Sequence, residues 1–251
     1  MGKIRKSIKD LVRQNLGFEI VNLSKRKTYN QDALLTVHNH DFMQDPAFVN
    51  AYARGLKATE KDPGMPWRVH VALWAAAHAK SLEGDFVECG VFKGFLSSAI
   101  MQYCDWNALN RHFYLFDTFR GLDEKYVSKS EKDNGRMELS KSEYSECYEK
   151  VKSNFAEFKN VHLVRGSIPE TLTTVNISKV CYLSIDMNCS LPEIAAANFF
   201  WDKMVSGAIA ILDDYAYVGF LDQKKAFDKF ANEHGIKILS LPTGQGLYIK
   251  P

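Results

Sequence analysis

The sequence predicts an α/β protein built on a doubly wound, mostly parallel sheet of seven strands. From about residue 83 onward, apolar runs alternate with helix-forming segments, as in parallel sheets that carry helices on both faces. The last two apolar runs are joined only by Pro242–Gln245, which is too short for a helical crossover. We therefore expect the sheet to end in an antiparallel hairpin.

The individual elements follow from this alternation of apolar runs and helix-like segments. The expected strands are Asp85–Cys89, His112–Asp117, Val161–Arg165, Val180–Asp186, Ala208–Asp213, Ile236–Leu241 and Gly246–Lys250. The expected helices are Phe95–Cys104, Glu143–Phe158, the short Pro169–Val175, Leu191–Met204 and Asp222–His234. Five β/α units closed by a terminal hairpin would place ligands at the carboxyl ends of the strands, near the switch in strand order.

The N-terminal part is expected to be helical and to contain no strand. A stripe of apolar and helix-forming residues runs from Trp67 to Ala77, after the breaker cluster Asp62–Pro66. We therefore expect a helical N-terminal cap or lid region at residues 1–82, followed by one domain at residues 83–251. Apolar residues such as Phe42 and Phe48 suggest packing onto a lid or a second subunit, so we expect a homo-oligomer.

The polar stretch at residues 123–141 is rich in charge and poor in apolar residues. A long polar insertion beside a strand end is either a lid over the site or a mobile loop. We leave both interpretations open.

The bulk composition favours a soluble protein without a nucleic-acid partner. The net charge is only +2, and the basic residues at 3–9 and 25–27 indicate a solvated helix face rather than a membrane-surface helix. There is no run of about eighteen apolar residues, so no membrane span is expected. None of the five cysteines forms a CxxC pair. We therefore expect a reducing, cytoplasmic location with no disulfide framework and no zinc site.

The stretch Glu88-Cys89-Gly90-Val91-Phe92-Lys93-Gly94 connects the first strand to the first helix of the sheet. Two glycines allow a tight turn, and the helix N-terminus that follows offers unpaired N–H groups to a carboxylate or other anion. The acidic side chain adds an acceptor for a ligand's ammonium or hydroxyl groups. This arrangement suits S-adenosylmethionine, whose amino-acid end carries both signs of charge. A nicotinamide dinucleotide would want three glycines and no carboxylate at the pyrophosphate. The alternative is a plain turn in which the glycines serve backbone geometry alone.

Carboxylates end four of the expected strands, at Glu88, Asp117, Asp186 and Asp213–Asp214. Buried strand ends are unfavourable places for charge unless something pairs with it. Asp117 could accept hydrogen bonds from a ribose diol, or it could cap the turn that runs from Thr118 to Gly121.

Asp186, Asp213 and Asp214 are expected to converge on one point. Three carboxylates together repel strongly, and a hard divalent ion such as Mg²⁺ relieves that repulsion. Alternatively, Asp214 caps the next segment and Asp186 binds the cofactor directly.

Five ordered motifs resemble the macrocin O-methyltransferase (TylF-like) family. They are Gly84–Gly94, Leu115–Leu122, Gly166–Leu172, Ser184–Asp186 and Ile211–Tyr215, within a match from about Trp67 to Tyr248. The resemblance implies a Rossmann-like, class I S-adenosylmethionine-dependent O-methyltransferase with Mg²⁺ and a hydroxylated small-molecule acceptor, often a sugar.

The resemblance also assigns roles to individual residues. It implies that Glu88, Gly90 and Gly94 hold the methionine end of the cofactor, that Asp117 holds the ribose, and that Ser167 lies near the adenine. It implies that Asp186, Asp213 and Asp214 carry the metal, and Asp186 can also contact the cofactor.

The chain departs from the family pattern after the fourth strand. Asp-Ala-Asp-Leu-Tyr is common there, whereas this chain has Asp186-Met187-Asn188-Cys189-Ser190, so Asn188 is a neutral ligand or none. A catalytic lysine of the catechol type is also missing, because that position is Cys189. We therefore expect Asp186 to act as a metal ligand and as the catalytic base. Nothing selects among His38, His40, His70 and His78, and satisfied helix histidines are the simpler interpretation.

Two alternatives to this function stay open from the sequence. A nucleotide-dependent oxidoreductase could use the same sheet, although the third glycine is missing. A cofactor-binding homologue without catalytic activity is also consistent with the altered stretch after Asp186.

Overall fold

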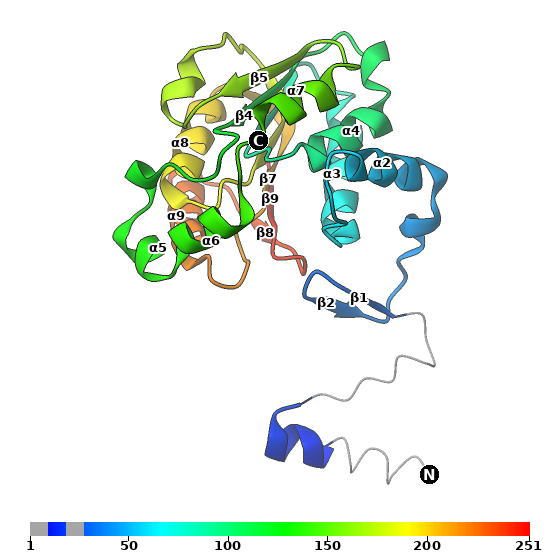
Figure 1. The fold of residues 1–251 in the computed structure, drawn as a ribbon, viewed down its shortest axis with the longest axis vertical. Helices are drawn as coiled ribbons and strands as arrows, with labels where there is room; N and C mark the ends of the chain where they lie inside the picture. The colour runs from blue at the N-terminus through cyan, green and yellow to red at the C-terminus, as the bar shows by residue number, and fades with distance from the viewer. Residues whose placement is uncertain (1–9, 19–27) are drawn as a thin grey trace. The chain divides into compact units, whose positions relative to one another are not determined.

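The computed structural model describes residues 10–18 and 28–251, which fall into two compact units divided between His40 and Asp41 (Figure 1). The first unit contains a helical segment at 10–16 and the antiparallel hairpin of β1 (Tyr29–Gln31) and β2 (Leu34–Thr36). The basic residues at 3–9 and 25–27 lie outside the described residues. None of the described helices is long and apolar enough to cross a membrane.

The hairpin corrects the expectation that no strand precedes residue 82. Its two turn residues, Asp32 and Ala33, both have positive φ angles, 53° and 56°. Left-handed backbone at both central positions is typical of the two-residue turns whose twist matches that of the paired strands. Strands of three residues are too short to produce a recognisable alternation in the sequence.

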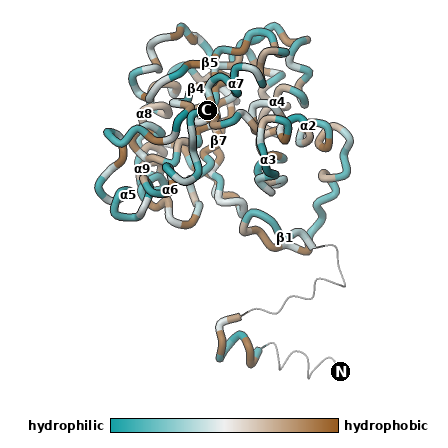
Figure 2. The backbone as a smooth tube through the Cα atoms, in the orientation of Figure 1, coloured by the Kyte–Doolittle hydropathy of each residue, from teal (hydrophilic) through white to brown (hydrophobic). Residues whose placement is uncertain are grey.

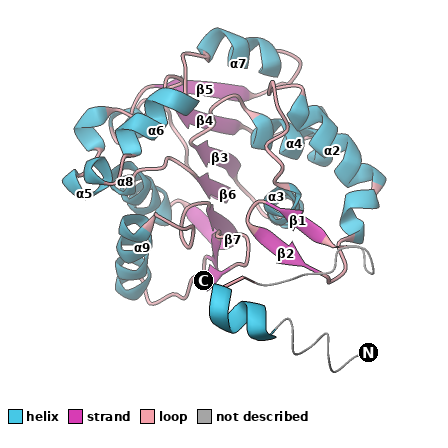
Figure 3. Ribbon diagram, turned by 60° about the horizontal axis from the view of Figure 1, so that its bottom comes forward, coloured by secondary structure: helices cyan, strands magenta, loops and turns pink. Residues whose placement is uncertain are grey.

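The second unit is built on a seven-stranded sheet in the order β5-β4-β3-β6-β7-β9-β8. Figure 3 shows the first five strands of this order, from β5 to β7. The strands are β3 (Asp85–Cys89), β4 (Phe113–Asp117), β5 (Val161–Arg165), β6 (Val180–Ile185), β7 (Met204–Leu212), β8 (Leu239–Ser240) and β9 (Gly246–Ile249). The first five strands pair in parallel, and β9 pairs antiparallel with both β7 and β8. The expected doubly wound sheet with a terminal antiparallel hairpin is therefore confirmed.

The sixth expected strand, Ile236–Leu241, is reduced to the two residues of β8. The backbone N–H of Ile236 donates to the carbonyl of Ala231 (3.0 Å), so the chain is still closing the preceding helix at this point. Pairing with β9 starts only at Leu239.

The helices of this unit connect the strands. They are α2 (Pro46–Leu56), α3 (Pro66–Ala79), α4 (Phe95–Cys104), α5 (Lys129–Asp133), α6 (Arg136–Glu143), α7 (Tyr148–Phe155), α8 (Ser190–Trp201) and α9 (Leu221–Glu233). Short 3₁₀ turns add η1 (Asp41–Gln44), η2 (Trp106–Ala108), η3 (Glu124–Tyr126) and η4 (Glu170–Thr173). The expected helix Glu143–Phe158 therefore begins only at Tyr148, and the expected short helix Pro169–Val175 is the 3₁₀ turn η4.

Side chains of successive strand residues enter two different cores, as the period of two in a strand requires. Phe86 packs with α2, α3, α4 and α7 on one face of the sheet, and Val87 packs with α8 and α9 on the other. The rings of Phe42 and Phe48 contact each other within the first of these cores, with their centroids 5.0 Å apart. Phe48 is therefore buried and Phe42 partly buried, which corrects the expectation that these two residues are exposed, whereas Phe18, expected to be exposed as well, is 68% exposed. The homo-oligomer and the boundary near residue 82 stay predictions.

The polar insertion is folded into η3, α5 and α6, and Figure 2 shows its mostly hydrophilic colouring. Buried Glu131 accepts hydrogen bonds from the backbone N–H groups of Ser128 (2.8 Å) and Ser190 (2.7 Å), the latter at the start of α8. Arg136 donates to the carbonyl of Gly219 and lies over the ring of Phe220. The insertion is thus held against the loops that follow β6 and β7.

Replacing Glu131 with alanine should loosen this insertion, because two partly buried backbone N–H groups lose their acceptor. We expect the free energy of unfolding to fall by about 2 kcal/mol, and tryptic cleavage at the lysines of the insertion to accelerate. Urea denaturation and limited proteolysis measure both effects. Exposed Glu138 of α6 provides the matched control, and E138A should change stability by less than about 0.5 kcal/mol. Equal behaviour of the two variants would contradict the anchoring role of Glu131.

Candidate functional site

A pocket of about 520 Å³ opens at the carboxyl ends of β3, β4, β6 and β7. It lies where the strand order switches, since β3 pairs with β4 on one side and β6 on the other. The sequence-predicted residues that line it are Glu88, Gly90, Asp117, Ser167, Asp186 and Asp213. Gly94 and Asp214 are not among the lining residues.

The two glycines of the first turn are required by the packing of the protein itself. Both have positive φ angles, 93° at Gly90 and 84° at Gly94. A Cβ at Gly90 would lie 1.7 Å from the carbonyl oxygen of Asp186, and one at Gly94 would lie 2.6 Å from the ring of Phe155. The alternative interpretation, that the glycines serve backbone geometry, accounts for both positions. Contact of either glycine with a cofactor stays a prediction.

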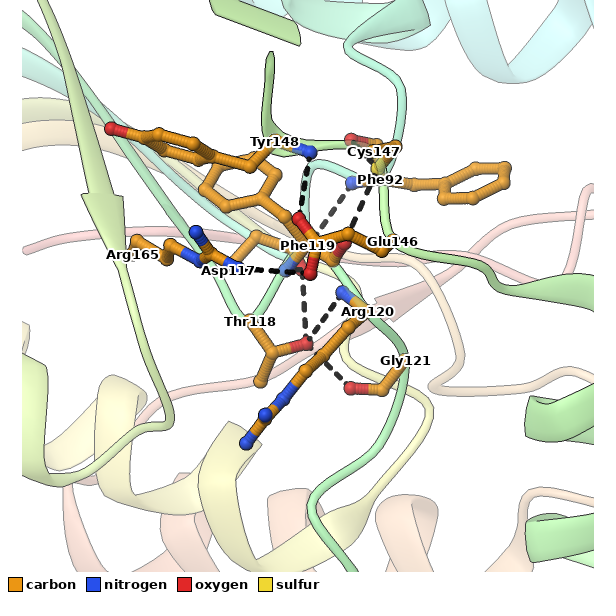
Figure 4. A network of polar contacts seen from close by, with 10 residues as sticks. All are labelled: Phe92, Asp117, Thr118, Phe119, Arg120, Gly121, Glu146, Cys147, Tyr148 and Arg165. Atoms are coloured by element: carbon orange, nitrogen blue, oxygen red, sulfur yellow. Dashed lines mark hydrogen bonds and ion pairs between the residues drawn. The ribbon is translucent and has the colours of Figure 1, made fainter. Parts of the chain in front are cut away.

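Asp117 connects the glycine turn to its own turn (Figure 4). Its Oδ2 accepts hydrogen bonds from the backbone N–H groups of Val91 (2.6 Å) and Phe92 (2.7 Å). Its Oδ1 accepts from the N–H of Phe119 (2.6 Å), and the Thr118 hydroxyl closes the turn onto the carbonyl of Gly121 (2.5 Å). The turn-capping role is thus present. Oδ2 already accepts two hydrogen bonds, so only Oδ1 retains a lone pair for a further donor, and binding of a ribose diol by Asp117 stays a prediction.

Those contacts also show which backbone groups are already used. The N–H of Gly90 donates to the carbonyl of Phe116 (2.8 Å), and the next two N–H groups donate to Asp117. The expected capture of an anion by unpaired N–H groups therefore does not apply to residues 90–92.

Glu88 is a buried carboxyl group with one oxygen that has no hydrogen-bond partner among the described residues. Its side chain is 3% exposed, and this oxygen is Oε2. Burial raises the pKa of Glu88 well above its usual range, and the nearby Ser97 hydroxyl opposes part of this rise without meeting hydrogen-bond geometry. A buried acceptor without a partner is costly, and a cationic group in the pocket would satisfy it. Contact of Glu88 with a cofactor stays a prediction.

Ser167 links the end of β5 to the polar insertion. Its hydroxyl donates to Oδ2 of Asp123 (2.7 Å), and this bond lowers the pKa of the Asp123 carboxyl. Asp123 also lines the pocket, although the sequence analysis did not identify it as a site residue. A contact of Ser167 with adenine stays a prediction.

Asp186, Asp213 and Asp214 converge as expected from their positions at strand ends. Each offers an oxygen that lies within 4.8 Å of the others. Burial, and then the charges of its two partners, raise the pKa of Asp186 well above its usual range. Burial, and then Glu193 and Asp213, do the same to the pKa of Asp214. Three crowded oxygen donors of this kind fit a hard divalent cation such as Mg²⁺.

Several residues that the sequence pattern does not reveal make hydrogen bonds to this acidic cluster or to the loop beside it. Asp213 accepts from Nη1 of Arg68 (2.6 Å) at one oxygen and from Nε2 of Gln245 (3.0 Å) at the other. Buried Glu193 accepts from the N–H groups of Met187 (3.2 Å) and Cys189 (3.3 Å), and so fixes the loop after β6. All these contacts are long-range or sit in irregular loops, where no sequence periodicity reveals them.

No histidine lines the pocket within the described part of the chain. His70 stacks on Phe42 (4.1 Å between ring centroids), and Nε2 of His78 lies 3.0 Å from the carbonyl oxygen of Gly207. His78 therefore has a hydrogen-bond partner within the protein, whereas for His70 the structure shows the packing of its ring against Phe42.

The fold and the position of the pocket define the class of protein. A seven-stranded sheet with a reversed last strand and a ligand pocket beyond the first strand is the architecture of class I S-adenosylmethionine-dependent methyltransferases. Residues 69–240 match the family model of macrocin-O-methyltransferase (TylF), and the chain belongs to that family. It is accordingly an S-adenosylmethionine-dependent O-methyltransferase rather than a nucleotide-dependent oxidoreductase.

Solved structures of methyltransferases share the fold at low sequence identity. The O-methyltransferase NovP is 19% identical, with a TM-score of 0.64 over 73% of this chain and 79% of that chain. The calicheamicin methyltransferase CalS11 is 14% identical, with a TM-score of 0.56 over 85% and 94%. A putative caffeoyl-CoA O-methyltransferase from Staphylococcus aureus is 13% identical, with a TM-score of 0.55 over 84% and 96%. No curated protein sequence matches the chain.

Removing the positive charge of Arg68 beside Asp213 should destabilise the protein. The Arg68 and Asp213 side chains are only 18% and 12% exposed, so R68M leaves a mostly buried carboxylate beside two others. We expect a loss of about 2–3 kcal/mol in the free energy of unfolding, measured by urea denaturation. The control is K179M, which removes an exposed pair with Glu83 and should cost less than about 1 kcal/mol. A loss no larger than that of the control would show that Arg68 does not balance the acidic cluster.

Proposed function

We propose that the protein transfers a methyl group from S-adenosylmethionine to a hydroxyl of a polyhydroxylated small molecule, a sugar or polyol, with the assistance of Mg²⁺. The observation that carries this proposal is the convergence of Asp186, Asp213 and Asp214 beside a pocket that also contains the glycine turn. Vicinal hydroxyl groups chelate a divalent ion well, and such an ion supplies Lewis-acid polarisation of an acceptor hydroxyl.

The cofactor is proposed to occupy the part of the pocket next to β3, β4 and β5. Glu88 would take the ammonium at its unpartnered oxygen, Gly90 would border the methionine end, and Asp117 would face the ribose. Ser167 and Asp123 would lie beside the adenine. The methyl group would then point towards the acidic cluster.

The acceptor molecule is proposed to lie between the acidic cluster and the segment that joins α2 to the start of α3. Thr59, Pro63 and Met65 between α2 and α3 line the pocket, together with Arg68 at the start of α3. These contacts support the proposal that part of residues 1–82 covers the site. A sugar acceptor is supported by CalS11, whose unliganded structure names it as a TDP-rhamnose 3′-O-methyltransferase of calicheamicin biosynthesis.

Asp186 is proposed to accept the proton of the acceptor hydroxyl. A carboxyl group whose pKa is raised by burial is a stronger base than one in water. Burial also raises the pKa of the neighbouring Cys189 thiol, which therefore stays protonated. A cytoplasmic location is a further proposal, supported by five free, buried cysteines.

The cofactor site is tested by calorimetry with S-adenosylhomocysteine. We expect the wild-type protein to bind it and E88Q to bind at least about tenfold more weakly, because a charge-assisted hydrogen bond contributes about 1.5–3 kcal/mol. E83Q removes an exposed carboxylate just before β3 and should bind like the wild type. Equal affinity in E88Q and E83Q would show that Glu88 does not hold the cofactor.

The metal site is tested by replacing Asp213 and Asp214 with alanine together. Methyl transfer to a polyol acceptor should fall below detection, while the affinity for S-adenosylhomocysteine stays measurable, because the two aspartates hold the ion rather than the cofactor. Excess chelator should have the same effect on the wild type. Full activity in the variant or in chelator would remove Mg²⁺ from the proposal. Cofactor binding without transfer to any polyol, with or without Mg²⁺, would instead indicate a homologue without catalytic activity.

A further inference from the structure

Two neutral amide side chains contact the carboxylates of the acidic cluster. Nδ2 of Asn188 donates to Oδ1 of Asp186 (3.2 Å) and to the hydroxyl oxygen of Tyr144 (3.3 Å). Nε2 of Gln245 donates to Oδ1 of Asp213 (3.0 Å). The two amides come from different parts of the chain, the loop after β6 and the connection between β8 and β9. Each reaches one aspartate and occupies one of its two oxygens.

The protein fixes the direction in which the Gln245 amide points. Its Oε1 accepts a hydrogen bond from the hydroxyl of Thr243 (3.0 Å), so Nε2 is the end that faces Asp213. Gln245 is only 1% exposed and Thr243 only 5%. An amide with both ends bonded inside the protein has one favourable orientation.

The backbone fixes Asn188 in a different way. Its φ angle is +55°, in the left-handed region that asparagine tolerates better than most residues other than glycine. The side chain then bridges Asp186, at the end of β6, and Tyr144, in the connection between α6 and α7. The T-shaped contact of Tyr144 with Phe92, with ring centroids 4.8 Å apart, holds the far side of this bridge.

We infer that Asn188 and Gln245 are positioning residues of the proposed metal site. Each amide holds Oδ1 of one aspartate by an N–H group. At Asp186 the other oxygen then stays available to a metal ion. At Asp213 the other oxygen accepts from Nη1 of Arg68 at 2.6 Å, so a metal ion would share that oxygen with the guanidinium or displace it. This inference rests on the proposed function, since it presupposes that the cluster binds a divalent ion.

The chemistry of an amide suits this task better than that of a carboxylate. An N–H donor stabilises an ionised aspartate without adding negative charge to a cluster that already holds three carboxylates. An amide nitrogen that points at Asp186 does not coordinate a cation. In this orientation Asn188 is a neutral neighbour of a metal ligand and not itself a ligand.

The test measures the affinity for Mn²⁺ directly, by electron paramagnetic resonance with S-adenosylhomocysteine present. N188G retains the left-handed backbone without strain and removes the amide, and Q245M removes the other amide at similar volume. Each should weaken Mn²⁺ binding by about tenfold or more, the usual effect of losing a group that orients a metal ligand. Affinity for S-adenosylhomocysteine should be unchanged. Q102M, on the exposed side of α4, is the matched control and should bind Mn²⁺ like the wild type.

The outcomes separate this inference from the proposed function. If the wild-type protein binds no Mn²⁺, the metal part of the proposed function fails, and this inference fails with it. If the wild type binds Mn²⁺ and both amide variants bind it equally well or more tightly, only the positioning role is overturned. Should Q245M fail to fold, N188G alone decides the question, because glycine accepts the backbone conformation of residue 188.

Discussion

The mutual repulsion of three carboxylates at one edge of the sheet is the constraint on which the arrangement of the site depends. Their nearest oxygens lie within 4.8 Å of one another. Two ionised carboxylates about 5 Å apart repel by roughly 3 kcal/mol at an effective dielectric constant of about 20. Three features of the protein reduce this repulsion. Burial and the neighbouring charges favour protons on Asp186 and Asp214. The guanidinium of Arg68 pairs with Asp213, and amide groups donate hydrogen bonds to Asp186 and Asp213.

The loop after β6 depends on the same balance of acceptors and donors. Residues 187–190 present backbone N–H groups to two buried carboxylates, Glu193 from α8 and Glu131 from α5. The polar insertion and the acidic cluster are thus joined through a single short loop. Because Asn188 lies within that loop and also contacts Tyr144, the wall of the pocket and the orientation of Asp186 are set together.

The sheet can be predicted from the sequence because its strands are determined by local patterns of residues. Apolar runs between helix-forming segments and a four-residue final connection determine the parallel strands and the terminal hairpin. Acidic residues at strand ends are equally visible, because parallel strands end at one edge of the sheet. Arg68 and Gln245 are not visible in this way, since their contacts with Asp213 span 145 and 32 residues. The glycine turn has a structural cause of its own, because Gly90 leaves room for the carbonyl of Asp186, and its contact with a cofactor stays a prediction.

The same contacts narrow the choice of proton acceptor for an O-methyl transfer. Asn188 replaces the aspartate that the family commonly carries, and an amide does not take up a proton near neutral pH. Burial raises the pKa of Tyr144 and of the Cys189 thiol, so both groups stay protonated and are donors rather than bases. Among these neighbours in the pocket wall, Asp186 is the carboxyl group that can receive a proton, provided that it is first ionised against the effect of burial and of its two acidic neighbours. Its basicity depends on the charge beside it, because a cation near Asp213 and Asp214 removes the repulsion that favours its protonated form.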